Sequence, residues 1–264
     1  MDKPYQLRPD IDVLPSHFPI LGMGFLAVNA FVIKADEPVL IDTGMGMESE
    51  DFLNALKSVI EPRDLKWVWI THDDADHTGS IQKLIESAPN TRLVANSLAV
   101  LRMSTAWSIP MDRVYWLNPG DSIRVGDRSL TAIRPPLFDN PTTIGLYDDK
   151  SEALFSADCF GAIIPSPVQD VNDLTEQDLI QGMISWASGD SPWVHMIEPD
   201  VFKQALDSIH RLAPKRILST HLPPALGKTE EFLTSLAVLP TSKPFVAPDQ
   251  AALEQMLAQT KIDG

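Results

Sequence analysis

The order of apolar and polar positions predicts short strands and longer helices that alternate along the chain. Runs rich in Val, Ile, Leu and Phe, bounded by Gly, Pro or charged residues, are typical of buried strands. Such runs lie at 25–33, 38–41, 67–70, 92–95, 144–147, 153–155 and 216–218. The segments 122–125 and 128–133 flank Gly126 and Asp127, which predicts a hairpin.

Other segments repeat apolar residues at intervals of three and four, the period of an amphipathic helix. The clearest covers 48–60, where Glu48, Glu50 and Asp51 occupy the first turn, a position that the helix dipole favours for anions. We expect further helices after residue 80, over 174–186 and 201–212, and in two segments that close the chain.

The elements alternate in two similar halves, about 18–125 and 126–264, and each half has polar residues just beyond a strand end. Sites in open α/β sheets lie at the carboxyl ends of strands. We therefore expect an α/β fold, a four-layer αβ/βα sandwich forming a single domain over 1–264, with the polar clusters where the strand ends of two sheets meet.

Composition narrows the function classes. The chain has 264 residues, 44% of them hydrophobic, which excludes a disordered or fibrous protein. Its net charge of −15 opposes binding to nucleic acid or to anionic membranes. The lone Cys159 cannot form an internal disulfide, residues 1–10 lack the apolar region of a secretory signal, and the uncharged stretch 18–33 is too short to span a membrane. We expect a cytoplasmic protein, with a homo-oligomer possible.

The segment 71–79, Thr-His-Asp-Asp-Ala-Asp-His-Thr-Gly, carries the most informative chemistry. In an extended loop, positions 72, 74 and 76 project to one side, and His77 follows where the chain turns toward a helix. Imidazole suits zinc and iron, and added carboxylates favour iron and manganese. This segment is therefore a candidate ligand set for two divalent metals. A solvated acidic loop that caps a helix explains the two histidines less well.

The segment resembles the signature of the metallo-β-lactamase superfamily, H-x-H-x-D-H between a strand and a helix, with an aspartate at the second histidine. Further matching segments follow in the same order, at 40–44 with Asp42, at 156–158, and at 219–221. The resemblance implies the metallo-β-lactamase fold, with Asp42 behind the ligands and Asp158 bridging two metals. The implied metal ligands are His72, Asp74, Asp76, His77, Asp158 and His221.

With a carboxylate at the second histidine position, the motif resembles that of the flavodiiron and related oxygen-binding di-iron proteins, which use H-x-E-x-D-H. This resemblance implies one or two iron ions, or alternatively zinc or manganese, and a protein that binds or reduces dioxygen or nitric oxide. Flavodiiron proteins carry a flavodoxin domain after this one, and the chain is too short for it. We therefore expect a separate electron donor.

One departure from that branch concerns the loop 134–142, where the family has another histidine ligand. Here the loop has no histidine, and Pro136 stands at the aligned place. The site with Asp76 and His77 is then complete, and the site with His72 is one ligand short. We expect one metal to be held tightly and a second weakly or not at all, unless His195 or Asp139 is a surrogate ligand.

Two alternatives stay open. A metallo-hydrolase would use a metal-bound hydroxide, oriented by Asp76 as the catalytic residue, against a small-molecule ester, thioester or lactone. A binding protein with an incomplete site would hold one metal or none. The metal content and the visible spectrum of the purified protein distinguish these possibilities.

Overall fold

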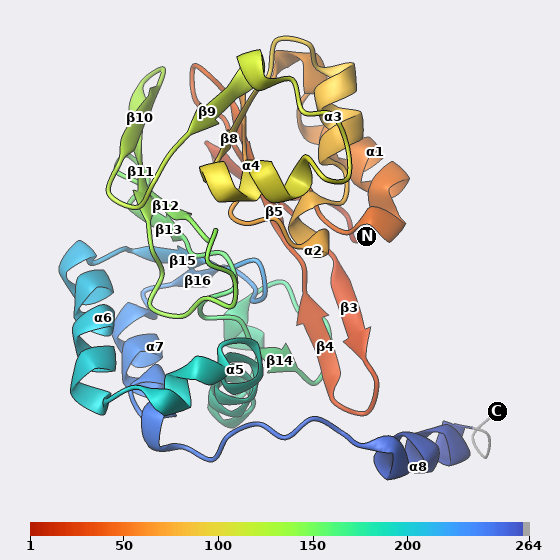
Figure 1. The fold of residues 1–264 in the computed structure, drawn as a ribbon, viewed down its shortest axis with the longest axis vertical. Helices are drawn as coiled ribbons and strands as arrows, with labels where there is room; N and C mark the ends of the chain where they lie inside the picture. The colour runs from red at the N-terminus through yellow and green to blue at the C-terminus, as the bar shows by residue number, and fades with distance from the viewer. Residues whose placement is uncertain (261–264) are drawn as a thin grey trace.

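The computed structural model describes residues 1–260, which form two large sheets packed face to face (Figure 1). The first sheet has seven strands, antiparallel from β1 to β6 and parallel from β6 to β9. In sheet order they are β1 (Tyr5–Arg8), β2 (Ile11–Leu14), β5 (Ala30–Ile33), β6 (Val39–Ile41), β7 (Trp67–Trp69), β8 (Arg92–Ala95) and β9 (Val114–Trp116).

The second sheet has six strands and is antiparallel except where β13 and β15 run parallel. In sheet order they are β10 (Ser122–Val125), β11 (Arg128–Ile133), β12 (Gly145–Asp148), β13 (Ala153–Phe155), β15 (Arg216–Leu218) and β16 (Ala225–Leu226). A small third sheet joins β3 (His17–Ile20), β4 (Gly24–Ala27) and β14 (Ile163–Ile164).

Helices cover the outer face of each large sheet (Figure 1). The first sheet carries α1 (Ser49–Val59), α2 (Ala75–Thr78), α3 (Ile81–Ser87) and α4 (Ser97–Met103). The second carries α5 (Glu176–Asp190), α6 (Pro199–Leu212) and α7 (Thr229–Leu236), and α8 (Gln250–Thr260) follows at the end. Short 3₁₀ turns lie at Gly46–Glu48, Pro62–Asp64, Met111–Arg113, Val171–Asp173, Pro192–Met196 and Leu239–Thr241.

Strand alternation explains the layers. In β6, Val39 and Ile41 join the apolar layer between the two sheets, whereas Leu40 packs against the helices on the other face. In the middle layer Phe31 of the first sheet meets Phe155 of the second edge to face, with ring centroids 5.3 Å apart. The expected αβ/βα sandwich is confirmed.

The structure departs from the predicted elements in the N-terminal half and at the division between the sheets. The apolar run 25–33 is divided between β4 and β5, which belong to different sheets, because Asn29 leaves both ladders. Its backbone N–H donates to Thr220 O at 2.9 Å and its side chain to Leu222 O at 2.8 Å. The division between the sheets lies between Trp116 and Ser122, a few residues earlier than the predicted halves.

The apolar-polar pattern also did not predict α4 or the strands β1, β2, β9, β14 and β16. Within residues 1–260, none of the helices combines the length and apolar character needed to cross a bilayer.

The loop after β6 and the end of α2 are joined backbone to backbone. Thr43 N donates to His77 O and Gly79 N donates to Gly44 O, both at 2.8 Å. A Cβ atom on Gly79 would lie 2.1 Å from Gly46 N, whereas a Cβ on Gly46 would find its nearest neighbours at 3.7 Å. Only a glycine at 79 permits this approach.

We expect Gly79→Ala to destabilise the protein by at least about 2 kcal/mol, because the new methyl group must push two backbone segments apart. Gly46→Ala, on the facing segment, should cost less than about 1 kcal/mol. Urea unfolding of both variants measures the difference. Equal losses would contradict the close approach.

Candidate metal centre

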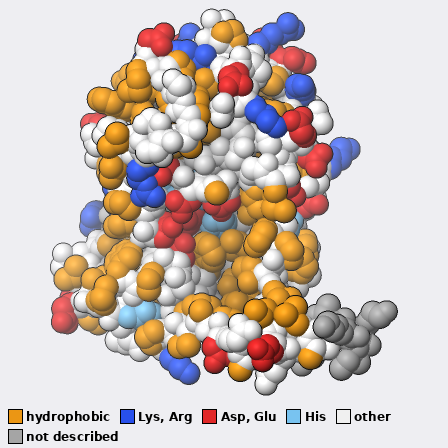
Figure 2. All heavy atoms as spheres, turned by 45° about the vertical axis from the view of Figure 1, so that its right-hand side comes forward, with side chains coloured by type: hydrophobic (Ala, Val, Ile, Leu, Met, Phe, Trp, Pro, Cys, Tyr) orange, Lys and Arg blue, Asp and Glu red, His pale blue; other side chains and the backbone are white. Residues whose placement is uncertain are grey.

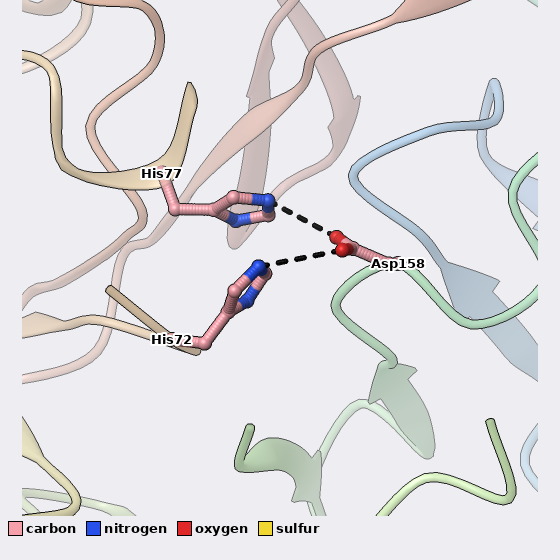
Figure 3. A group of neighbouring side chains, drawn as sticks. All are labelled: His72, His77 and Asp158. Carbon is pink, nitrogen blue, oxygen red and sulfur yellow. Dashed lines mark ion pairs between the residues drawn. The ribbon is translucent and has the colours of Figure 1, made fainter. Parts of the chain in front are cut away.

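Three loops converge at one edge of the sandwich, and each begins where a strand ends. The loop after β7 and the start of α2 carry 71–77, the loop after β13 carries 156–158, and the loop after β15 carries 219–221. Since β13 and β15 are parallel neighbours, their carboxyl ends share an edge of the second sheet. Figure 3 shows His72 and His77 pointing across this edge toward Asp158.

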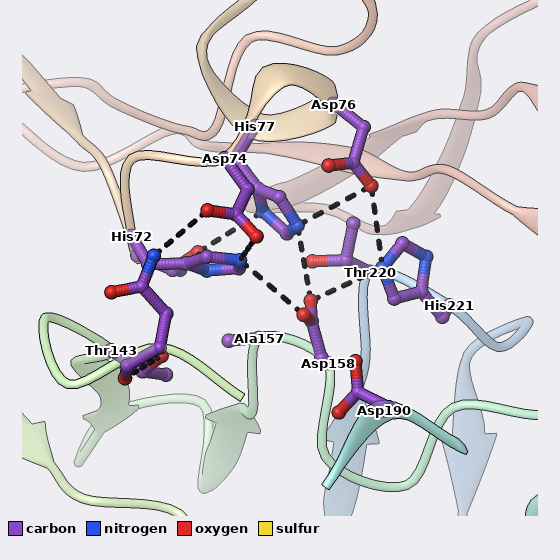
Figure 4. Close-up of polar contacts among 12 residues, drawn as sticks. His72, Asp74, Asp76, His77, Thr143, Ala157, Asp158, Asp190, Thr220 and His221 are labelled. Carbon is purple, nitrogen blue, oxygen red and sulfur yellow. Dashed lines mark hydrogen bonds and ion pairs between the residues drawn. The ribbon is translucent and has the colours of Figure 1, made fainter. Parts of the chain in front are cut away.

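The Asp158 carboxylate lies among three imidazoles (Figure 4). Its Oδ1 is 3.0 Å from His77 Nε2 and 3.1 Å from His221 Nε2, and its Oδ2 is 3.3 Å from His72 Nε2. Asp76 Oδ2 is 3.4 Å from His221 Nε2, and Asp74 Oδ2 is 3.7 Å from His72 Nε2. The structure thus brings together all six residues that the sequence singled out as ligands.

The far nitrogen of each histidine has a partner that orients the ring. His221 Nδ1 donates to Ala27 O at 2.7 Å, because a carbonyl can only accept. His77 Nδ1 lies 2.8 Å from Asp42 Oδ2, and His72 Nδ1 lies 3.2 Å from Thr71 Oγ1. A hydrogen on Nδ1 leaves Nε2 with a free lone pair facing the cluster, as in metal-binding histidines.

Asp42 is buried and stands in the left-handed region at φ 58°. Besides facing His77, its carboxylate accepts hydrogen bonds from Thr71 N at 2.8 Å and Thr71 Oγ1 at 2.9 Å. A non-glycine residue at such φ carries strain, which is characteristic of functional sites. These contacts hold the loop after β7 in place behind the cluster.

Several atoms of this cluster have no hydrogen-bond partner. Among the described residues, six buried side-chain atoms lack one, and three of them are His72 Nε2, His77 Nε2 and Asp158 Oδ1. Buried polar atoms in folded proteins normally have partners. All three face the same space, and a cation there would satisfy them together. The residues present therefore fit a metal.

Asp73, in the middle of the same loop, points the other way. Its carboxylate pairs with Arg102 Nε at 2.7 Å and accepts from Thr142 Oγ1 at 2.9 Å. Asn140 Nδ2 donates to Asp74 Oδ1 at 2.8 Å and so orients that carboxylate. The predicted alternation holds for residues 72–74, whereas Asp76 lies on α2. Asn140 and Arg102 are supporting residues that the sequence did not reveal.

Two more carboxylates adjoin the cluster. Asp139 offers an oxygen within 4.8 Å of ligand atoms of His72 and Asp74. Carboxylate oxygens of Asp139, Asp158 and Asp190 also lie within 4.8 Å of one another. His195 is in none of the candidate groups formed by the described residues, and its Nε2 lies 2.8 Å from Ser188 Oγ. Of the two residues considered as surrogate ligands, only Asp139 lies beside His72 and Asp74 among the described residues. Asp190 was not predicted, since nothing in the sequence links the end of α5 to the cluster.

Burial and neighbouring charges have opposite effects on the pKa values of the histidines. Burial alone would lower the pKa of His221, but the charge and hydrogen bonding of Asp158, together with Asp76, raise it to about 9. Burial would raise the pKa of Asp158, yet the three imidazoles hold it well below its usual range. Without a metal, the cluster therefore retains protons on its histidines.

The outer carboxylates respond differently. Burial, followed by the charge of Asp158, raises the pKa of Asp139 to about 6. Burial and the charges of Asp158 and Asp139 raise the pKa of Asp190 to about 7. Carboxylates this close repel one another when ionised, and a cation would relieve that repulsion.

The layers and the clustered side chains define a metallo-β-lactamase-type sandwich of the kind that forms flavodiiron cores. Residues 26–221 match the family described as ODP family beta lactamase, and the chain belongs to that family. The sequence resemblance to this branch is confirmed.

Known proteins resemble this chain in sequence and in fold. An uncharacterized protein of Methanocaldococcus jannaschii is 30% identical over 138 residues, which is 52% of this chain and 35% of that protein. The anaerobic nitric oxide reductase flavorubredoxin of Vibrio vulnificus is 28% identical over 134 residues, 50% of this chain and 27% of that protein. The chain thus matches about a third or less of the length of these relatives.

The rubredoxin oxygen:oxidoreductase of Desulfovibrio gigas superposes with a TM-score of 0.79 and 17% identity, covering 92% of this chain and 62% of that one. A fragment, 1–254, of the putative diflavin flavoprotein A 5 of Nostoc superposes with a TM-score of 0.72 and 17% identity, covering 90% of this chain and 96% of the fragment. At these identities the likeness establishes the fold.

We expect the chelator-treated protein to lose thermal stability as the pH rises from 6.5 to 9. His221 has a folded-state pKa of about 9 against an ordinary value of 6.5, so its contribution is complete below pH 6.5 and is lost as the pH passes 9. The melting temperature should fall by roughly 5 °C or more.

The control is His210→Gln, because His210 is an exposed histidine that bonds Glu230 outside the cluster. Its melting curve should keep the wild-type pH dependence, whereas His221→Asn should flatten it. An unchanged pH dependence in His221→Asn would contradict the assignment.

Proposed function

We propose that this chain holds two divalent metals at the cluster and binds or reduces dioxygen or nitric oxide there. The observation that carries the proposal is the division of the Asp158 carboxylate. One oxygen faces His77 and His221, and the other faces His72. A carboxylate with one oxygen toward each of two ligand groups is placed to bridge two ions.

Each position would have its own ligands. The first would use Asp76, His77, His221 and Asp158, and the second His72, Asp74, Asp139 and Asp158. The mixture of imidazole and carboxylate suits iron and also fits zinc or manganese. Iron is favoured because solved structures with the same fold are named flavo di-iron proteins. Bound iron would supply redox electrons and open coordination positions for a diatomic molecule.

The remaining contacts of the chain keep the site in shape. Asp42 and the Ala27 carbonyl prevent the His77 and His221 rings from rotating. Trp186 donates from Nε1 to Asp158 O at 3.1 Å, and its ring packs on His221 with centroids 4.7 Å apart. These residues exclude water from one side of the cluster and hold the bridging carboxylate in position.

Electrons are proposed to come from a separate redox partner. Support for this comes from the names of relatives, which include diflavin flavoprotein and flavorubredoxin.

A metallo-hydrolase is the second candidate, and one observation favours it. The Asp76 side chain is 33% exposed, so an organic substrate could reach a hydroxide oriented by this carboxylate.

Anaerobic loading with ferrous iron tests the two functions. The proposal expects close to two iron ions per chain and consumption of dioxygen or nitric oxide by the chemically reduced protein, both lost in Asp158→Asn. Zinc-loaded protein that hydrolyses p-nitrophenyl acetate, with no gas consumption by the iron form, would favour the hydrolase.

We expect Asp139→Ala to weaken binding of the second metal by at least about tenfold, because this variant removes an anionic oxygen from the position with only one histidine. His195→Ala should bind two metals like the wild type, since His195 faces Ser188. Calorimetric titration with manganese and metal analysis measure the effect. Loss in His195→Ala instead of Asp139→Ala would reverse the assignment.

A further inference from the structure

A cavity of about 600 Å³ opens beside the cluster, between the β3–β4 hairpin, the loop before α1, and α2. Its walls are mostly apolar. They include Phe18, Leu26, Val28, Met45, Met47 and Ala75. Figure 2 shows hydrophobic side chains gathered next to acidic and histidine side chains near the middle of one face.

The cavity and the cluster share one residue. Asp76 lines the cavity, and its Oδ2 lies 3.4 Å from His221 Nε2 and 3.6 Å from His77 Nε2. A molecule in the cavity would therefore lie next to the corner of the cluster formed by these three side chains.

The dimensions do not match a diatomic gas. Cavities that bind organic molecules have volumes of roughly 300–1,000 Å³, apolar walls and a few polar groups at one side. This cavity has that volume, and Asp76 and Thr78 provide the polar side. A gas molecule alone would leave most of this apolar surface exposed to water.

Charge narrows the class of ligand. Within the described residues, no Lys or Arg lines the cavity, and its only ionisable lining residue is Asp76. An anionic ligand would lie beside the Asp76 carboxylate and would find no Lys or Arg among the lining residues.

The rim is adaptable. Met47 is 81% exposed and Phe18 is 42% exposed, although both are large and apolar. Methionine is flexible and polarisable, and it adjusts to ligands of different shape. Large apolar side chains left exposed at the mouth of an apolar cavity indicate a surface that a ligand covers.

We propose that this cavity binds a neutral, apolar organic molecule of small-ligand size with one end against Asp76. The inference goes beyond the proposed gas chemistry. It is independent of that proposal, because the apolar lining is formed by side chains of the protein and requires no bound metal. Such a molecule would lie close enough to the proposed metals to take part in their chemistry.

The probe for this site is N-phenyl-1-naphthylamine, a neutral dye whose fluorescence rises in apolar surroundings. Titrated into chelator-treated protein, it should bind saturably at one site per chain. 8-Anilinonaphthalene-1-sulfonate has the same rings with a sulfonate added, and it should bind at least about tenfold more weakly, because its charge would have to enter an apolar lining whose only ionisable group is the Asp76 carboxylate.

Two variants at equally exposed methionines locate the dye. Met47→Glu should weaken its binding at least about tenfold by placing a charge at the rim, whereas Met196→Glu, at an 82% exposed residue outside the lining, should leave it unchanged. Ala75→Trp, at an exposed lining residue, should also reduce binding by filling space. Circular dichroism checks that each variant is folded.

Three results would each overturn the proposal. They are the absence of saturable binding of the neutral dye, tighter binding of the sulfonate, and equal effects of Met47→Glu and Met196→Glu. Because the protein carries no metal in this titration, a failure here leaves the metal proposal intact. A failure to load iron likewise leaves the dye result unaffected.

Discussion

The Asp158 carboxylate, buried among three imidazoles, is the interaction on which the rest of the centre depends. Two of those imidazoles come from the loop after β7 in the first sheet, and the third follows β15 in the second. An isolated buried carboxylate is very costly, so this one requires positive partners nearby. The need to balance a single buried charge therefore joins the edges of the two sheets.

Around this charge, one ring nitrogen of each histidine makes a contact that orients the ring, and the other nitrogen faces the cluster. Asp42, Thr71 and the Ala27 carbonyl contact the outer nitrogens of the histidines, whereas the inner nitrogens of His72 and His77 have no hydrogen-bond partner. The backbone contact at Gly79 fixes the helix that carries His77. These contacts position the ligand side chains through the protein's own hydrogen bonds, which is what pre-organised binding requires.

Sequence was sufficient for those parts of the site that depend on local spacing. Four of the clustered side chains lie within residues 72–77: alternation along the loop explains why Asp73 faces Arg102 while His72 and Asp74 face inward, and Asp76 and His77 follow on α2. The layer order also followed from alternating strands and helices.

What sequence missed depends on contacts between distant segments. Asp190 joins the cluster from the end of a helix, and Asn140 orients Asp74 across 66 positions. The division of 25–33 between two sheets is set by Asn29 bonding to the loop after β15. No periodicity encodes such contacts, because each depends on how the finished layers meet.

The Asp158 cluster also has a topological consequence. His77 and Asp158 are 81 positions apart in the sequence, and Asp158 and His221 are 63 positions apart. Each of these pairs therefore closes a long loop of the chain. Loop closure of this length is an entropic cost that only a nearly complete fold can offset. The centre should therefore assemble late in folding, and it acts as a non-covalent cross-link whose release and global unfolding are coupled.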